Sequence, residues 1–326
     1  MKKIEEINIC QVSLKRDIPL ILKNYLNFKK FYKQIKIFVI CPSRELFFFK
    51  DVLKYDEFQI ISEDQIISLN EFEKIFLKCS EKIIYKNEFR LRLNWYYQQI
   101  LKLSFMLNFF DEKKKNLIIW DADTIIINKI HFYNKEKPIN YGTFNEFHKQ
   151  YYITNLKILG ILPRYYISFL NQFVSITSKE AKFLESKLFQ EENKYKIKLS
   201  LKISELILKK IFSAHRVYNG SMFSEFELIG QSNYLLNNNK QKPILSLRFG
   251  LDGVLSNKQL GLVKFLGFKH ITYEHSHPNK KSLGMLNRQQ SWTGLIKIIS
   301  KNVTKFVLRS IKHDYFYKKN YGLKNK

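Results

Sequence analysis

Residues Asn116-Leu117-Ile118-Ile119-Trp120-Asp121-Ala122-Asp123-Thr124-Ile125-Ile126-Ile127 decide the fold of this chain. A short apolar run between polar residues is typical of a strand that is buried on both faces. Burying an unpaired carboxylate is very costly, so we expect Asp121 and Asp123 to lie at the carboxyl end of that strand. In open α/β sheets this edge is where ligands bind.

The residues before this stretch alternate between strand and helix patterns. We expect strands at 7–12, 35–40 and 58–61, and helices at 17–31 and 43–53 between them. Units of this kind build a parallel sheet. No Gly-x-Gly-x-x-Gly motif follows the first strand, which disfavours a dinucleotide-binding dehydrogenase. The sequence therefore predicts an α/β fold with a mixed, mainly parallel sheet flanked by helices.

Two carboxylates one residue apart can bind one hard divalent cation. Mg²⁺ prefers oxygen ligands and commonly keeps substrate phosphates in its shell, and Mn²⁺ accepts the same ligands. A metal at Asp121 and Asp123 would grip a diphosphate and stabilise it as a leaving group. The alternative is that the two residues simply form a turn at the end of the strand, because Asp is favoured in turns.

The apolar residues followed by Trp120-Asp121-Ala122-Asp123-Thr124 resemble the Asp-x-Asp (DxD) region of GT-A glycosyltransferases, which use nucleotide-diphospho-sugars. More narrowly, the chain resembles uncharacterised bacterial glycosyltransferases from surface-polysaccharide loci, such as those of lipopolysaccharide synthesis. The pattern of that group recurs at 95–102 and 223–227, and the resemblance covers roughly residues 7–236. It implies a GT-A-like fold with a Rossmann-like N-terminal half, and a hexosyltransferase-like activity that depends on Mn²⁺ or Mg²⁺.

The resemblance also implies that the loop after the first strand binds the nucleotide. Asp17 would accept a hydrogen bond from a uracil or ribose group, and Lys15 or Arg16 would meet phosphate. The alternative is that Asp17 only caps the helix that begins there.

The strongest helix pattern covers residues 95–110. Gln98, Gln99 and Lys102 lie near its start, where two neutral amides and a cation suit a sugar or a phosphate. Spacing alone favours an ordinary half-exposed helix, and the resemblance makes these three residues candidates for binding the nucleotide-sugar. Arg216, in a polar loop further along, is a second candidate for phosphate.

A second site-like region surrounds residues 212–236, where Ser224 is a plausible N-cap. A carboxylate in the first turn of a helix is stabilised by the helix dipole and stays ionised. Glu225 is therefore our first candidate, and Glu227 our second, for the base that accepts a proton from an acceptor hydroxyl. The alternative is that both glutamates only stabilise the helix.

Two late histidines, His275 and His277, lie two residues apart and would project to one side of an extended segment. Neutral imidazole is a common metal ligand. The resemblance implies that one of them completes the metal shell of Asp121 and Asp123, and the alternative is an ordinary surface loop.

The net charge of +27 calls for a polyanionic partner or surface. The N-terminus has no apolar segment typical of a signal peptide, and no apolar run is long enough to span a membrane. Three scattered cysteines, Cys10, Cys41 and Cys79, show no metal-binding spacing. We expect them to be reduced, as in a cytoplasmic protein.

The C-terminal residues 292–312 predict a basic amphipathic helix. From Lys297 onward there are nine Lys or Arg residues and one Asp, a net charge of +8. Such a helix fits an interfacial position on anionic lipid, and we expect a peripheral protein at the inner face of the cell membrane. The alternative is a helix packed on the domain with a solvated basic face.

We expect a glycosyltransferase domain at 1–290, with a nucleotide-binding half at about 1–127 and an acceptor half at about 128–290, followed by a basic tail at 291–326. The acceptor would be a glycan or a lipid-linked molecule. Two other functions stay open. The charge and the aromatic content also suit a single-stranded nucleic acid, but no nucleic-acid-binding motif is present and we expect no such partner. A metal-dependent phosphohydrolase could be built on Asp121, Asp123 and His275, but further acidic ligands at a recognisable spacing are not evident.

Overall fold

The structure of this chain is a computed structural model. It describes residues 6–110, 116–143, 146, 148–160, 168–189, 198–218, 220–238, 241–248, 251, 253–273 and 288–311.

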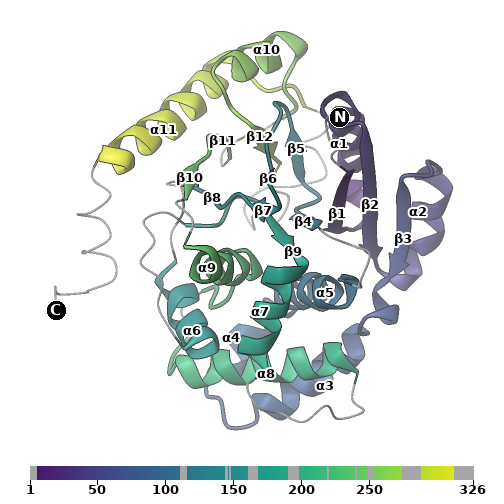
Figure 1. Ribbon diagram of the computed structural model, residues 1–326, viewed down its shortest axis with the longest axis vertical. Helices are drawn as coiled ribbons and strands as arrows, with labels where there is room; N and C mark the ends of the chain where they lie inside the picture. The colour runs from purple at the N-terminus through teal and green to yellow at the C-terminus, as the bar shows by residue number, and fades with distance from the viewer. Residues whose placement is uncertain are drawn as a thin grey trace.

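A five-stranded sheet forms the centre of the protein (Figure 1). Its strands lie in the order β3-β2-β1-β4-β9, of which the first four are parallel and β9 is antiparallel to β4. The strands are β1 (Glu6–Val12), β2 (Gln34–Cys41), β3 (Phe58–Ser62), β4 (Asn116–Trp120) and β9 (Phe173–Thr177). This sheet, with helices on both faces, confirms the mixed, mainly parallel α/β architecture.

Alternating side chains of the central strands pack in two separate apolar cores, one on each face of the sheet. Ile118 and Trp120 of β4 face the core that α1 (Ile18–Phe31) and α2 (Leu46–Val52) cover. Leu117 and Ile119 face the larger core under α5. The helices on that second side are α3 (Leu69–Cys79), α4 (Lys86–Arg90), α5 (Leu93–Phe109), α6 (Lys149–Leu159), α7 (Ser178–Leu188), α8 (Leu199–Ala214) and α9 (Glu225–Asn237). Since β4 is buried on both faces, its polar continuation must leave the sheet at the carboxyl edge.

A smaller sheet continues the chain directly after Asp123. It pairs β5 (Thr124–Ile126) with β12 (His270–Thr272), which also pairs with β11 (Ser246–Leu247). A third apolar core joins this sheet to α10 (Asn257–Phe265) and α11 (Trp292–Ile311). In α11, Leu295 and Ile298 are buried in that core, while Trp292 is exposed. The C-terminal helix is therefore packed on the domain along part of its length.

Four further short strands complete the described part of the fold. They form two pairs, β6 (Tyr133–Asn134) with β7 (Lys137–Pro138) and β8 (Tyr141–Gly142) with β10 (Lys242–Pro243). All three cysteines are free, as predicted.

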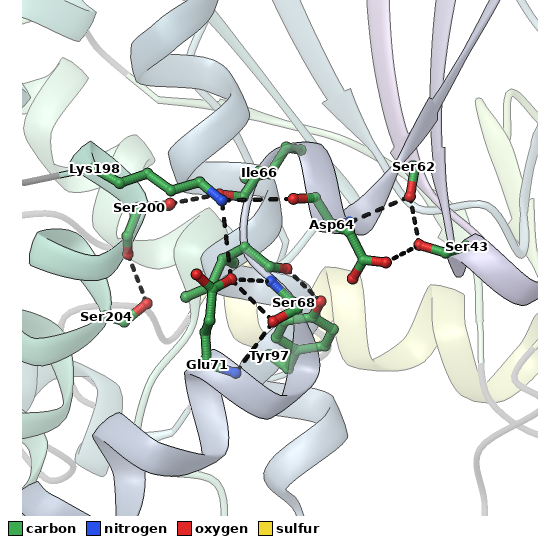
Figure 2. Close-up of polar contacts among 11 residues, drawn as sticks. Ser43, Ser62, Asp64, Ile66, Ser68, Glu71, Tyr97, Lys198, Ser200 and Ser204 are labelled. Atoms are coloured by element: carbon green, nitrogen blue, oxygen red, sulfur yellow. Dashed lines mark hydrogen bonds and ion pairs between the residues drawn. The ribbon is translucent and has the colours of Figure 1, made fainter.

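A polar cluster ties the carboxyl ends of β2 and β3 to α3 and α8 (Figure 2). We call it the Ser68 cluster, and it comprises Ser43, Ser62, Asp64, Ser68, Glu71 and Lys198. The Ser68 side chain accepts a hydrogen bond from the Glu71 backbone N–H at 3.2 Å, and Glu71 Oε2 accepts from the Ser68 N–H at 2.8 Å. This reciprocal capping box begins α3. Lys198 Nζ lies 3.9 Å from Glu71 Oε2.

Candidate active site at the carboxyl edge of the sheet

The Asp-x-Asp stretch forms a tight turn beyond β4. The Thr124 N–H donates to the Asp121 carbonyl at 3.1 Å, which closes a turn around Ala122 and Asp123. The Trp120 indole Nε1–H donates to the Thr124 carbonyl at 2.7 Å and braces the turn from the core side. Asp121 and Asp123 therefore lie at the carboxyl edge of the sheet, as the sequence predicts. They also lie in a turn, which is what the turn-only alternative requires.

Lys102 of α5 lies between two carboxylates that come from different elements. Its Nζ atom is 2.5 Å from Asp121 Oδ1 and 2.6 Å from Glu225 Oε1. The side chains of Lys102 and Glu225 are each only 3% exposed. Gln99, one turn earlier on α5, accepts a hydrogen bond from the Glu225 backbone N–H at 3.1 Å through Oε1. The structure thus brings four predicted site residues together, although 126 positions separate Gln99 from Glu225 in the sequence.

Burial and the neighbouring charges shift the pKa values of Lys102 and Glu225 in opposite directions. Burial alone would lower the pKa of Lys102, but the Asp121 and Glu225 carboxylates raise it above its ordinary value, so the ammonium stays charged. Burial raises the pKa of Glu225, and the opposing attraction of Lys102 does not fully offset this. One ammonium against two carboxylates leaves a net charge of −1 in a largely buried site. Such a site favours a further cation or a set of hydrogen-bond donors.

The second oxygen of Asp121 faces Gln172, which sequence reasoning did not single out. The Gln172 amide lies between Asp121 and Arg248, and only one of its two orientations satisfies both neighbours. In that orientation its nitrogen donates to Asp121 Oδ2 at 2.5 Å, and its oxygen accepts from the Arg248 guanidinium at 2.8 Å. Arg248 in turn binds the Glu146 carboxylate. We call Lys102, Asp121, Glu225, Gln99 and Gln172 the Lys102 cluster. In the sequence, Gln172 and Arg248 lie in loops without periodicity, so no motif pointed to them.

Asp123 is half-buried, and its Oδ1 atom accepts from the Thr124 hydroxyl at 3.3 Å. Among the residues that the structure describes, no group of three or more His, Cys, Asp or Glu side chains is arranged to hold a metal ion. His275 and His277 lie outside the described residues. The described residues therefore offer two carboxylates in this turn, those of Asp121 and Asp123. Mg²⁺ is commonly bound by one or two protein carboxylates when substrate phosphates supply other ligands.

Glu227 is buried, and its side chain contacts residues of the scaffold. Its Oε1 atom accepts from the Ser168 hydroxyl and, at 3.0 Å, from the Phe169 N–H, while Oε2 accepts from Gln231 at 3.3 Å. These contacts fix the segment that leads into β9. They distinguish Glu227 from Glu225, which faces Lys102.

The remaining candidates lie apart from the Lys102 cluster or at its margin. Lys15 and Asp17 follow β1, the parallel neighbour of β4, so they lie at the same sheet edge. Asp17 Oδ2 accepts from the Leu14 N–H at 2.9 Å and so closes the 3-10 turn Lys15–Asp17 that precedes α1. Asp17 is also the N-cap residue of α1, but its side chain makes no capping hydrogen bond to that helix. Gln98 is half-buried beside Gln99, and Arg216 is exposed in the loop after α8.

His270 of β12 is a buried histidine behind the turn. Its ring packs edge-on against Trp120 and Phe173, with centroids 6.1 and 5.6 Å away. Neither ring nitrogen has a hydrogen-bond partner among the described residues. Burial, with a smaller contribution from Arg248, lowers the pKa of His270 to about 3, so its imidazole is neutral.

A separate hollow of about 340 Å³ lies between α6, α7 and α8. It is lined by Ile158, Lys187, Leu188, Lys202, Glu205, Leu206, Lys209 and Lys210. None of the predicted site residues that the structure describes lines it. The one carboxylate among its described lining residues, Glu205, pairs with Lys209 at 2.8 Å and with Lys78 at 3.3 Å.

No protein-family model matches this chain. No curated protein matches it either. Among solved structures, the apo form of mouse xyloside xylosyltransferase 1 aligns with 9% identity and a TM-score of 0.36, covering 85% of this chain and 100% of that one. The galactosyltransferase LgtC, in complex with donor and acceptor sugar analogs, aligns with 8% identity and a TM-score of 0.34, covering 91% of this chain and 96% of that one. At TM-scores this low, the similarities by themselves establish neither fold nor function.

Proposed function

We propose that this protein is a glycosyltransferase that moves a sugar from a nucleotide-diphospho-sugar to a glycan or lipid-linked acceptor. The observation that carries the proposal is the buried Lys102, bridging Asp121 and Glu225 beyond the carboxyl end of β4. Ligands of open α/β sheets bind at this edge. The likeness of residues 116–127 to the DxD region supports the same conclusion.

The donor diphosphate would lie against the Asp121–Thr124 turn. Asp121 and Asp123 would hold Mg²⁺ or Mn²⁺, whose chemistry there is to neutralise charge on the diphosphate leaving group. Their hard oxygen donors and the net negative charge around Lys102 fit such an ion. Lys102 holds Asp121 in one orientation, so the carboxylate does not have to be arranged when the donor binds.

The chain's other residues would position donor and acceptor. Lys15 and Asp17 would contact the nucleotide from the end of β1, and Gln98 and Arg216 would be further contacts to the donor. Glu225 would accept the proton of the acceptor hydroxyl. Burial raises its pKa above the ordinary carboxyl value, and a base titrating closer to neutral pH is more effective in proton transfer.

A screen of UDP- and GDP-sugars with Mn²⁺ tests this function. A bound donor should raise the unfolding temperature by mass action, and the protein should then hydrolyse that donor slowly. Asp123→Ala should abolish the hydrolysis. Hydrolysis of phosphoesters without a sugar would overturn the proposal in favour of a phosphohydrolase. Nucleic-acid binding that falls steeply with salt and ignores Asp123→Ala would favour a nucleic-acid-binding protein.

We also infer that α11 places the protein on an anionic membrane surface. None of the described helices is long and apolar enough to cross a membrane. Trp292 and Ile296 of α11 are 47% and 57% exposed, next to the exposed Lys297 and Lys301. This pairing of apolar and basic groups suits a lipid interface. Sedimentation with phosphatidylglycerol vesicles should deplete the protein, Trp292→Ser with Ile296→Ser should reduce this, and equal binding to neutral vesicles would contradict the inference.

A further inference from the structure

Arg248 immediately follows β11, and its side chain is only 15% exposed. Burying a guanidinium is costly unless it is paired and hydrogen-bonded. The Glu146 carboxylate supplies the charge partner, and His148 Nε2 lies 2.6 Å from the other oxygen of Glu146. Burial alone would raise the pKa of Glu146, but Arg248 and His148 hold it below its ordinary value, so the pair is ionised.

Arg248 also contacts a neutral side chain, that of Gln172. This contact is not needed to balance the charge of Arg248, because Glu146 already does so. All three guanidinium nitrogens lie within 3.1 Å of the Gln172 amide oxygen. This contact fixes which way the amide points, because only its nitrogen can then face Asp121. Asp121 Oδ2 receives that N–H at 2.5 Å. By holding the Gln172 amide oxygen, Arg248 therefore directs the Gln172 N–H toward Asp121.

The backbone of Gln172 is also held in an unusual conformation. Its φ is +67°, in the left-handed region that non-glycine residues rarely adopt. Its carbonyl accepts from the Asp121 N–H at 2.9 Å. Backbone strain of this kind is concentrated at functional sites. Both the main chain and the side chain of Gln172 are thus used to fix Asp121.

Helix α11 fixes the strand end that carries Arg248. The Asn302 amide, whose residue is 3% exposed, donates to the Arg248 carbonyl at 3.2 Å and to the Ile298 carbonyl at 2.9 Å. Leu295 and Ile298 pack in the same core as Leu247, the residue before Arg248. The C-terminal helix is therefore connected to the Lys102 cluster through Arg248, which contacts Asn302 with its carbonyl and Gln172 with its side chain.

We propose that Arg248 is a positioning residue for Asp121, acting through Gln172, and that α11 holds it in place through Asn302. Lys102 fixes one oxygen of Asp121 and Gln172 the other, so the carboxylate has one orientation. When Arg248 is lost, the Gln172 amide loses the contact that fixes its oxygen, so its N–H holds Asp121 Oδ2 less firmly and the carboxylate is free to turn. The proposal depends on the proposed glycosyltransferase function only where it is tested by kcat for donor hydrolysis.

A double-mutant cycle of Arg248→Met and Gln172→Met tests the relay. Each variant should lower kcat for donor hydrolysis by about 10- to 100-fold, the usual effect of losing a partner of a metal-binding or catalytic group. The double variant should be no worse than the poorer single one, because both remove the same interaction. Arg248→Lys should be intermediate, and Arg288→Ala, which removes an exposed arginine outside the relay, should match the wild type. Multiplying effects, or single variants with wild-type kcat, would overturn the proposal.

Crystal structures of the same variants separate this proposal from the function. In Arg248→Met and in Asn302→Leu, the Asp121 carboxylate should turn from its position beside Lys102, whether or not any donor is hydrolysed. An Asp121 side chain unchanged in both variants would refute the relay even if the protein were an active transferase. A displaced Asp121 in a protein inactive on every donor would support the relay and refute the function.

Discussion

The Ser68 cluster and the Lys102 cluster both lie beyond the carboxyl ends of strands in the central sheet, but their polar groups are used differently. In the Ser68 cluster (Figure 2), Ser62 and Ser68 each form a capping box that begins a helical segment, and Glu71, which also pairs with Lys198, is partly exposed. In the Lys102 cluster, an almost fully buried ammonium holds two carboxylates, one from the turn after β4 and one from α9. Neither contact of that ammonium caps a helix.

This difference teaches how to separate a scaffold from a site. A capping box contributes roughly 1 kcal/mol and needs no buried charge. A buried ion pair contributes little or nothing to stability compared with apolar residues of the same size. The stability of the fold therefore accounts for the Ser68 cluster but not for the Lys102 cluster, and the proposed catalytic role would account for the latter.

Removing the lysine from each cluster gives the largest contrast. Lys102→Met should lower kcat for donor hydrolysis by about 10²–10³-fold, since it removes a preorganised charge from the site. It should also destabilise the protein by about 3–5 kcal/mol, because the buried Glu225 carboxylate and the partly exposed Asp121 carboxylate lose their partner. Lys198→Met in the Ser68 cluster is the matched control and should leave kcat unchanged. Similar kcat values for the two variants, measured on the folded fraction, would remove the distinction.

The two glutamates of α9 sharpen the comparison within one helix. Glu225→Gln should lower kcat by about 10²-fold or more, since the amide cannot accept a proton. Glu227→Gln should mainly lower the unfolding temperature, because the contacts with Ser168 and Phe169 are weakened. Steady-state kinetics and thermal unfolding of both variants check this. The reverse pattern would identify Glu227 as the base.

His270 predicts a pH dependence of stability near the Lys102 cluster. Its pKa is lowered to about 3 in the folded protein, while the unfolded chain titrates near its ordinary value of about 6.5. Below that pH the unfolded state binds the proton first, so the free energy of unfolding falls by up to about 1.4 kcal/mol per pH unit until about pH 3. Urea unfolding of His270→Phe should show a flatter pH profile, and parallel profiles would contradict this.

The smallest effect belongs to the Ser68 cluster. Ser68→Ala removes the N-cap of α3 and should cost about 1 kcal/mol of unfolding free energy. The kinetic constants for the donor should not change. A loss of activity beyond the loss of folded protein would show that this cluster takes part in the reaction.

The fold was predictable from sequence where periodicity was strong. The alternation of strand and helix up to β4 and the apolar run of residues 116–120 led to the correct sheet, and the polar break at Asp121 placed its edge. Lys102 and Glu225 were found as separate candidates. Their direct contact was not predictable, because it depends on how α5 and α9 pack on the same face of the sheet.

The other half of the site escaped prediction for a physical reason. Gln172 and Arg248 act through a left-handed backbone and a single side-chain contact, and neither leaves a periodic pattern in the sequence. The C-terminal helix was predicted from its amphipathic pattern. Its attachment through Asn302 was not, since an asparagine in a helix is more often exposed than buried.

The most direct test of the central claim is a crystal structure of the protein with a nucleoside diphosphate and Mn²⁺. The claim predicts the diphosphate at the Asp121–Thr124 turn, beside the Lys102 cluster. A nucleotide bound instead in the lysine-lined hollow between α6, α7 and α8, with no ligand at the turn, would contradict it.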